Sequence, residues 1–550
     1  MRVTPGLRCF SVLFFATTLS AQQRLGPPMS AAALRTRLES YAADSMRGRL
    51  TGTPDNVKAT RFIAEELRKL GLRPMGDDGT FLQRVPLVRA TLDTAASTIT
   101  IAGHALRPYA DYMPRNQGLR TRAFDGVPVV FAGVWGDTAH LLGGAAVRGK
   151  VVLLAVPPNN PTVIKLQAQA VFAQAHAIVI ANFDLLPPGL IAQISAAPLT
   201  LVSAPSATAP SPDTLPAYMH ITTAMAAQWL DVAALGDASS GREASAIRGL
   251  IRFRDTPTEA YNVVAALAGS DPALRGEYVA IGAHNDHIGT GEPQDRDSTR
   301  TFNLELRAKQ LENHGLITQS IYESIHVNMD SIRRAQPVPR RDSIYNGADD
   351  DGSGSMGLLE IARAFAGDRT KPKRSMLFIW HTGEELGLFG SQHFTDHPTV
   401  PREQIVAELN IDMIGRGKPG DETDGGPNYL QLIGSRRLST QLGDLVEQVS
   451  REKKFDWAFD YQFDATGHPE QYYCRSDHYM YARYGIPIVF MSTGGHADYH
   501  EMTDEVEFID FDKLSKVSRF VHELAVAVGN APARPLVDKP KPDPRGQCVQ

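Results

Sequence analysis

Five short segments of the sequence contain most of the histidines and acidic residues that could carry out chemistry. They are residues 283–289 (AHNDHIG), 346–354 (NGADDDGSG), 381–387 (HTGEELG), 410–413 (NIDM) and 498–504 (DYHEMTD). Taken singly, each is a weak signal, because a histidine after a strand is usually structural and an acidic pair before a helix is usually a first-turn charge favoured by the helix dipole. Their chemistry depends on whether the fold brings them together.

Each of these segments lies at the end of a predicted strand or in the turn that follows it. After Thr256, apolar runs alternate with amphipathic stretches, which predicts strands at residues 261–268, 278–283, 376–380, 405–411 and 487–491 and helices at 355–366 and 514–528. This alternation predicts a three-layer α/β/α sandwich around a mostly parallel sheet, in which ligands bind beyond the carboxyl ends of the strands. The five segments are therefore expected to converge at one edge of the sheet.

A metal ion is the simplest compensation for carboxylates and imidazoles that are buried together at such an edge. The three cysteines, Cys9, Cys474 and Cys548, form no C-x-x-C pair, which excludes a cysteine-based zinc site. Histidine and carboxylate ligands suit zinc and, less well, manganese or cobalt. Two histidines and three carboxylates, one of them bridging, would hold two metal ions about 3.5–4 Å apart, as in two-metal hydrolases.

In order and spacing, the five segments resemble the co-catalytic two-zinc exopeptidases, a family that includes secreted leucyl-type aminopeptidases, aminopeptidase S, glutamate carboxypeptidase and glutaminyl cyclase. The resemblance extends to residues 48–52 (GRLTG), which are similar to a stretch near the start of the family's catalytic domain. The region around residues 149–153 (GKVVL) resembles a protease-associated domain. The resemblance therefore implies a zinc exopeptidase fold with an inserted small mixed α/β domain.

The resemblance also implies the metal ligands of two zinc ions, and Asp350 would bridge both ions. The set is His284, Asp350, Glu385, Asp412 and His500. The choice of Asp350 over Asp349 and Asp351 rests on the resemblance alone. Asp286, two residues after His284, would accept a hydrogen bond from that imidazole and orient it.

Other residues near these ligands are expected to act on the substrate or to support the site. Glu384, left without a metal bond, would act as general base and then as general acid. Tyr499 resembles a tyrosine that donates to the developing oxyanion in some relatives, and a packed aromatic ring is the alternative. His287 and the segment 476–478 (SDH) are interpreted as parts of the pocket wall or its support, and His496 is expected at the surface.

The organisation of the chain can be predicted in outline. Residues 1–21 are typical of a secretory signal peptide, with Arg2 and Arg8 before an apolar run. The protein is therefore expected to be secreted or periplasmic. No other stretch is apolar enough to span a membrane. We expect residues 22–115 and 250–530 to form the catalytic domain, residues 116–249 a protease-associated-like insert, and residues 531–550 a proline-rich tail. Residues 291–345 form a charged insertion, either a lid or a surface excursion.

The predicted function is a zinc-dependent exopeptidase, most simply an aminopeptidase that acts on peptides. A net charge of −5 without a long basic block speaks against nucleic acid, and the sequence has neither G-x-S-x-G nor H-E-x-x-H. The alternatives are a carboxypeptidase, which would present arginines such as Arg475 to a carboxylate, glutaminyl cyclase, and a receptor-like binding protein. The side-chain preference, the native metal, the oligomeric state and the pairing of Cys474 with Cys548 remain open.

Overall fold

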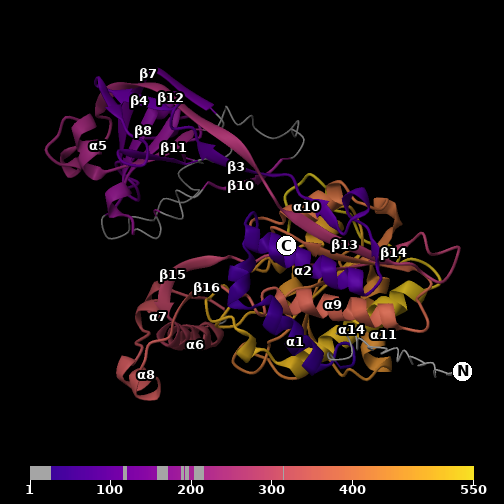
Figure 1. Ribbon diagram of the computed structural model, residues 1–550. Helices are drawn as coiled ribbons and strands as arrows, with labels where there is room; N and C mark the ends of the chain where they lie inside the picture. The colour runs from indigo at the N-terminus through magenta and orange to yellow at the C-terminus, as the bar shows by residue number, and fades with distance from the viewer. Residues whose placement is uncertain are drawn as a thin grey trace, which may run out of the picture. The chain divides into compact units, whose positions relative to one another are not determined.

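The computed structural model describes residues 26–115, 121–157, 171–187, 191, 197–202, 216–313 and 315–550 (Figure 1). The expected signal peptide lies outside these residues. The chain divides into two compact units: the larger comprises Met1–Leu50, Lys58–Gln83 and Asn262–Gln550, and the smaller comprises Thr51–Val57 and Arg84–Tyr261. Among the residues described, no helix has both the length and the apolar character needed to cross a membrane.

The larger unit contains a mixed sheet with strand order β1-β13-β17-β14-β18-β21-β19-β20, and β2 pairs with β13. The strands are β1 (Arg73–Pro74), β2 (Leu82–Arg84), β13 (Tyr261–Leu267), β14 (Tyr278–His284), β17 (Ser375–His381), β18 (Ile405–Ile411), β19 (Tyr429–Ile433), β20 (Ala458–Asp460) and β21 (Ile488–Ser492). The four neighbouring strands β17, β14, β18 and β21 run parallel, whereas β13 and β19 pair antiparallel with them. The predicted α/β class is therefore confirmed, with a sheet that is parallel at its centre.

Helices cover both faces of this sheet because successive strand residues point to opposite sides. Val263 and Ile281 belong to the core that also contains residues of α1 (Ala31–Tyr41), α2 (Pro54–Lys69), α9 (Gly352–Gly367), α11 (Thr440–Glu452) and α14 (Phe511–Asn530). Their neighbours Val264 and Ala280 belong to the opposite core, with residues of α10 (Phe389–Asp396), α12 (Tyr472–Arg475) and α13 (His478–Ala482). Burial on both faces explains why β14, β17 and β18 are buried at every position.

The smaller unit has its own sheet, with strand order β10-β3-β12-β7-β8-β9-β11-β6 and with β4 and β5 at the side of β12. Its strands are β3 (Leu87–Leu92), β4 (Thr98–Ile101), β5 (His104–Leu106), β6 (Tyr112–Arg115), β7 (Thr121–Val134), β8 (Val151–Ala155), β9 (Ala177–Ala181), β10 (Leu199–Leu201), β11 (Ala217–Ile221) and β12 (Glu243–Thr258). One helix, α5 (Thr223–Trp229), packs on it. This unit also has an apolar core of its own, as a separately folded domain requires.

The charged insertion in the larger unit folds as a short ribbon that carries three helices (Figure 1). The ribbon pairs β15 (Thr290–Asp295) with β16 (Arg341–Ile344), and between them lie α6 (Arg296–Glu312), α7 (Gln319–Glu323) and α8 (Met329–Ala335). Asp295 caps α6, since its side chain accepts hydrogen bonds from the backbone of Asp297 and Ser298. The antiparallel ribbon brings the two ends of the insertion together beside the segments that contain His284 and Asp350.

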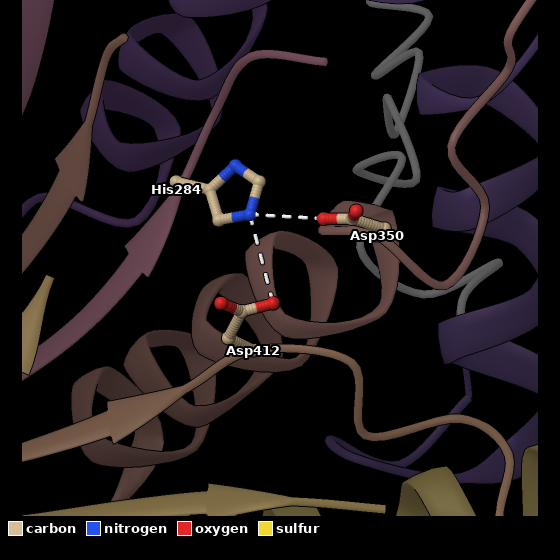
Figure 2. Close-up of side chains that lie close together, drawn as sticks. All are labelled: His284, Asp350 and Asp412. Atoms are coloured by element: carbon tan, nitrogen blue, oxygen red, sulfur yellow. Dashed lines mark ion pairs between the residues drawn. The ribbon is translucent and has the colours of Figure 1, made fainter. Parts of the chain in front are cut away.

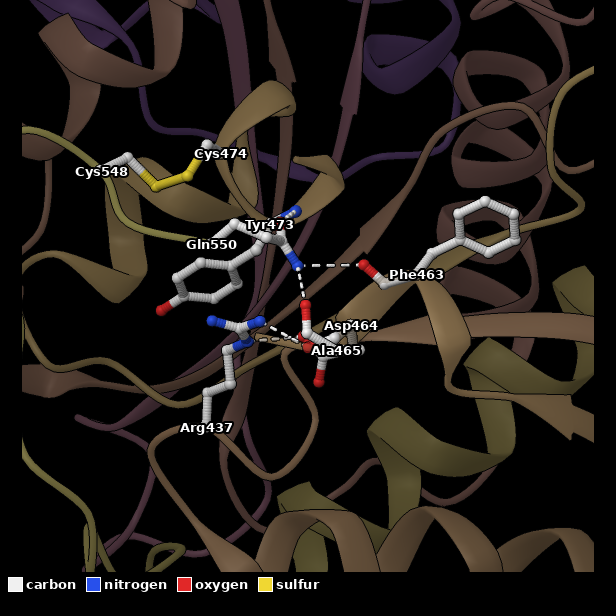
Figure 3. The surroundings of a disulfide bond; sticks show 8 residues. All are labelled: Arg437, Phe463, Asp464, Ala465, Tyr473, Cys474, Cys548 and Gln550. Carbon is white, nitrogen blue, oxygen red and sulfur yellow. Dashed lines mark hydrogen bonds and ion pairs between the residues drawn. A yellow bond between two sulfur atoms is a disulfide. The ribbon is translucent and has the colours of Figure 1, made fainter. Parts of the chain in front are cut away.

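The tail after Asn530 has no regular secondary structure but is fastened to the larger unit (Figure 3). Cys474 and Cys548 form a disulfide bond. Two residues further on, the Gln550 side chain donates to the carbonyl oxygens of Phe463 (3.0 Å) and Ala465 (3.1 Å). The pairing that the sequence left open is thus made, and it holds the segment from Phe463 to Cys474.

Candidate active site

The side chains that the sequence singled out converge because their strands are neighbours. His284 is the last residue of β14, and it pairs in register with His381, the last residue of β17. Asp412 directly follows β18, on the other side of β14. Asp350 stands in the turn before α9. Parallel strands end at the same edge of a sheet, so these residues meet there.

One group at this edge consists of His284, Asp350 and Asp412, all of them buried (Figure 2). The Nε2 atom of His284 lies 3.1 Å from Asp350 Oδ1 and 3.6 Å from Asp412 Oδ1. Burial by itself would lower the pKa of His284, but the carboxylates of Asp412, Asp286 and Asp350 raise that pKa well above its ordinary value. The group therefore attracts positive charge, and its nitrogen and oxygen donors could hold a metal ion.

A second group forms around the other oxygen of Asp350. The Nε2 atom of His500 lies 3.0 Å from Asp350 Oδ2 and 3.0 Å from Glu385 Oε2. Burial would lower the pKa of His500, but Asp350 and Glu385 raise it to about 10. His287 approaches the same two carboxylates, with Nδ1 2.6 Å from Glu385 Oε1 and 3.8 Å from Asp350 Oδ2. Asp350 thus presents one oxygen to each of two groups that could bind a metal.

The neighbours of Asp350 have their carboxylates committed elsewhere. Asp349 Oδ1 accepts a hydrogen bond from the backbone of Gly415 (2.7 Å). Asp351 caps α9 by accepting from Gly354 (2.9 Å), and its other oxygen accepts from the backbone of His284 (3.0 Å). Of the three consecutive aspartates, only Asp350 therefore places both carboxylate oxygens beside the histidines.

Arg49, in the segment GRLTG, supports the turn that carries Asp350. Its guanidinium is fully buried and donates to the backbone carbonyls of Tyr41 (3.3 Å), Asn346 (2.6 Å) and Gly347 (2.9 Å). The preceding Gly48 has φ +66°, and a Cβ atom there would lie 2.2 Å from the carbonyl oxygen of Gly289. The sequence revealed this segment only as a resemblance, because nothing local indicates which carbonyls it meets.

Glu384 and Tyr499 both face the cavity beside the two groups. Burial raises the pKa of the Glu384 carboxyl well above its ordinary value, and the nearby carboxylates of Asp412 and Glu385 raise it further. The ring of Tyr499 stacks on His500 with centroids 4.0 Å apart, and its hydroxyl accepts a hydrogen bond from Arg475 Nη2 at 3.2 Å. The two roles considered for Tyr499, a packed ring and a donor to the oxyanion, are thus compatible, since its ring packs on His500 and the residue lines the cavity.

Ser476 lines the cavity, as expected of a pocket support, and makes one further contact, whereas His496 lies elsewhere than expected. Ser476 contacts a predicted ligand itself, because its Oγ donates to Asp412 Oδ2 at 2.8 Å and accepts from Asn410 Nδ2 at 3.0 Å. His496 is not at the surface. It is buried, with Nε2 3.3 Å from Asp349 Oδ2, because the loop after β21 folds back over the aspartate turn.

The cavity beside these residues has a volume of about 710 Å³. Glu384, Glu385, Asp412, Tyr499 and His500 lie in its wall. The cavity is large enough for several residues of a peptide, within the usual range of small-molecule sites.

Comparison with known proteins places this unit in a family. Residues 262–525 match the model of Peptidase family M28. A "Leucine aminopeptidase 1" of Trichophyton equinum is 30% identical over 213 residues, 36% of this chain and 54% of that protein. A "Leupeptin-inactivating enzyme 1" of Streptomyces exfoliatus is 40% identical over 82 residues, 14% of this chain and 19% of that protein. The chain spans about half the length of the curated leucine aminopeptidases it matches.

Solved structures with a similar arrangement include two bacterial enzymes. The "Aminopeptidase from Aneurinibacillus sp. strain AM-1" is 17% identical with a TM-score of 0.48, covering 94% of this chain and 97% of that chain. "BSAP, a zinc aminopeptidase from Bacillus subtilis" is 16% identical with a TM-score of 0.47, covering 91% and 95%. The match of residues 262–525 to the model of Peptidase family M28 confirms the resemblance drawn from the five segments, and these residues carry the candidate site.

Proposed function

We propose that this protein is an exported aminopeptidase that hydrolyses the amino-terminal peptide bond of peptides with a two-zinc centre. The observation that carries the proposal is the position of Asp350, whose two oxygens face two different histidine and carboxylate groups. Such sharing of one carboxylate is what a pair of metal ions needs. The names of the curated relatives, leucine aminopeptidases, support the aminopeptidase reading.

The donor set fits zinc. His284 and Asp412 would hold one ion, Glu385 and His500 the other, and Asp350 both. His284 Nε2 is buried and faces the Asp350 and Asp412 carboxylates but makes no hydrogen bond with good geometry among the described residues, as expected of an atom reserved for a metal. When bound, zinc supplies Lewis acidity toward a peptide carbonyl and makes water more acidic.

Two further side chains would orient these ligands. Asp286 lies on the Nδ1 side of His284, with its backbone oxygen at 3.2 Å and its carboxylate at 3.7 Å. His287 would donate from Nδ1 to Glu385 Oε1, which leaves Oε2 of that carboxylate for the metal. We therefore assign His287 to positioning Glu385 and not to a sixth metal ligand.

Glu384 and Tyr499 would act on the reacting atoms. The Glu384 carboxylate would take a proton from the attacking water and later deliver it to the nitrogen of the leaving amine. The Tyr499 hydroxyl, held by Arg475, would donate to the carbonyl oxygen as negative charge develops there.

Export and the role of the smaller unit belong to the same proposal. Residues 1–21 would direct the chain to the periplasm or the medium and be removed. The smaller unit, with its own sheet and core, would be a protease-associated domain, as the resemblance of residues 149–153 implies. The disulfide between Cys474 and Cys548 supports an oxidising compartment.

A carboxypeptidase is the alternative that a specific observation supports, because Arg475 and Arg307 both line the cavity. The donors of Arg307 are engaged by the Asp421 and Gly495 carbonyls and by Gln310. Arg475 has partners as well, Glu470 and the Tyr499 hydroxyl, but its side chain is the more exposed of the two (46% against 14%), so it is the arginine placed to meet a substrate carboxylate.

The test uses one peptide in three forms: with both termini free, with an acetylated amino terminus, and with an amidated carboxyl terminus. Aminopeptidase activity requires cleavage of the free and amidated forms, loss of cleavage on acetylation, and loss of all cleavage with a zinc chelator. Cleavage that survives acetylation but not amidation would identify a carboxypeptidase instead.

Two variants separate catalysis from metal binding. Glu384→Ala is expected to abolish turnover and retain bound zinc, whereas Asp350→Ala is expected to lose zinc as well. Zinc content measured on the purified proteins distinguishes them. Substantial activity of Glu384→Ala would refute the role given to Glu384.

A further inference from the structure

One face of helix α6 in the charged insertion belongs to the wall of the cavity. Asn303, Leu306, Arg307, Gln310 and Leu311 line it, at the i, i+3, i+4, i+7, i+8 spacing of a single helix face. Leu304, on the other side of the same helix, is 43% exposed and does not line the cavity. The insertion is thus placed over the candidate active site and not on a remote surface.

Charged side chains fasten α6 to the segments that carry the reactive residues. Arg300 Nε donates to Asp498 Oδ1 at 3.0 Å, two residues before His500. Arg307 donates to the Asp421 carbonyl from Nε (2.8 Å) and Nη2 (2.6 Å) and to the Gly495 carbonyl (3.3 Å). Its Nη2 also lies 3.1 Å from Glu422 Oε1. Because these partners are buried or backbone atoms, α6 is a fixed wall.

Part of the cavity wall is apolar and aromatic, formed by Phe463, Tyr472 and Phe490. The rings of Phe463 and Tyr472 are stacked, with centroids 5.0 Å apart. The disulfide of Cys474 and the hydrogen bond from Gln550 to the Phe463 carbonyl hold this wall in place (Figure 3). Leu306 and Leu311 therefore line a cavity that aromatic rings also line, and Glu384 and Tyr499 belong to the same cavity.

We propose that α6 determines specificity: Leu306 and Leu311 would bind the side chain of the substrate's cleaved residue and select peptides with a bulky apolar amino-terminal residue. This inference rests on the proposed aminopeptidase function. Its physical basis is the transfer of an apolar side chain from water to a cavity lined by leucine and aromatic carbons. A small side chain such as that of alanine leaves most of this surface uncovered.

The test compares two peptides that differ only in their first residue, leucine or alanine. For the wild-type enzyme, kcat/KM is expected to be higher with leucine. The variant Leu306→Ala/Leu311→Ala is expected to lower the leucine-to-alanine ratio about tenfold, mainly through a higher KM for the leucine peptide, since one methylene contact in such a pocket changes the ratio by about 10-fold or more. The alanine peptide, which covers little of this surface, is the reference for the ratio.

Leu304→Ala is the matched control, a leucine of the same helix outside the cavity, and it should leave the ratio unchanged. If the double variant lost cleavage of both peptides, the single variants Leu306→Ala and Leu311→Ala would take its place, each with an expected decrease of about threefold. An unchanged ratio in variants that still cleave the alanine peptide would overturn this inference alone. Absence of cleavage by the wild-type enzyme would overturn the proposed function and this inference with it.

Discussion

Replacing Ser476 with alanine should weaken zinc binding although Ser476 is not a ligand. The Ser476 hydroxyl accepts from Asn410 Nδ2, so its own proton is directed at Asp412 Oδ2, 2.8 Å away. A hydrogen bond to a charged group is worth about 1.5–3 kcal/mol. Since about 1.4 kcal/mol is a factor of ten, the variant should bind zinc about 10–100-fold more weakly at the position that Asp412 serves.

The assay is a titration of the metal-free protein with zinc in competition with a chelator of known affinity. Ser518→Ala is the control, because Ser518 is also fully buried but its hydroxyl donates to the Leu514 carbonyl of its own helix. That variant should bind zinc like the wild type. If Ser476→Ala bound both zinc equivalents within about threefold of the wild type, Asp412 would not depend on this hydrogen bond and the reasoning would fail.

Three further predictions concern pH, the disulfide and the support of the aspartate turn. Burial raises the pKa of Glu422 from 4.5 to about 7, so its contribution to stability is complete below pH 4.5 and is lost as the pH rises through 7. Over this pH range the free energy of unfolding of the wild type, measured in urea, should fall by about 3 kcal/mol at most, and that of Glu422→Gln should not. Identical pH profiles for the two proteins would contradict the prediction. Cys548→Ser should raise KM for a leucine-terminated peptide severalfold with unchanged zinc affinity; an unchanged KM would show that the aromatic wall holds without the disulfide. Arg49→Ala removes the guanidinium donor from three carbonyl oxygens, of which Gly347 keeps a hydrogen bond from the Gly352 amide, and should lower the free energy of unfolding by about 3 kcal/mol in urea, whereas the exposed Arg68→Ala should leave it nearly unchanged.

The strands and the convergence of the site could be predicted because they depend on local pattern and on one general rule. The apolar runs of β14, β17 and β18 are continuous, as expected of strands buried on both faces. Neighbouring parallel strands then bring their carboxyl ends together, and His284 and Asp412 follow from that rule. No side-chain contact had to be known in advance.

The choice among three adjacent aspartates could not be made from the residues themselves. It depends on the contacts that occupy the two neighbouring carboxylates: the backbone of Gly415 donates to Asp349, and the first turn of α9 donates to Asp351. The first of these contacts joins segments that are distant in the sequence. His496 was expected at the surface for the same reason, since its burial against Asp349 depends on how two loops pack. Long-range pairing of polar groups leaves no periodic signal in a sequence.

The insertion was the least predictable part of the site, because its sequence allowed either a lid or a surface excursion. Arg300 and Arg307 are the side chains that fix α6 over the cavity. An arginine on a solvated helix face and one that meets buried carbonyls look alike in a sequence. Only the partners, Asp498 and Asp421, distinguish the two cases.

The proposed metal ligands and the cavity walls are thus held by separate parts of the chain. The ligands stand at strand ends and in turns fixed by Arg49 and Asp504, the latter accepting hydrogen bonds from the backbone of Asp349 and Asp350. The walls come from the insertion and from the segment that the disulfide to Cys548 fastens. Rigid elements that position the chemistry and loops that shape the pocket can change independently. Substitutions in the walls should therefore alter which peptide is cleaved while the metal centre and the proton transfer by Glu384 stay as they are.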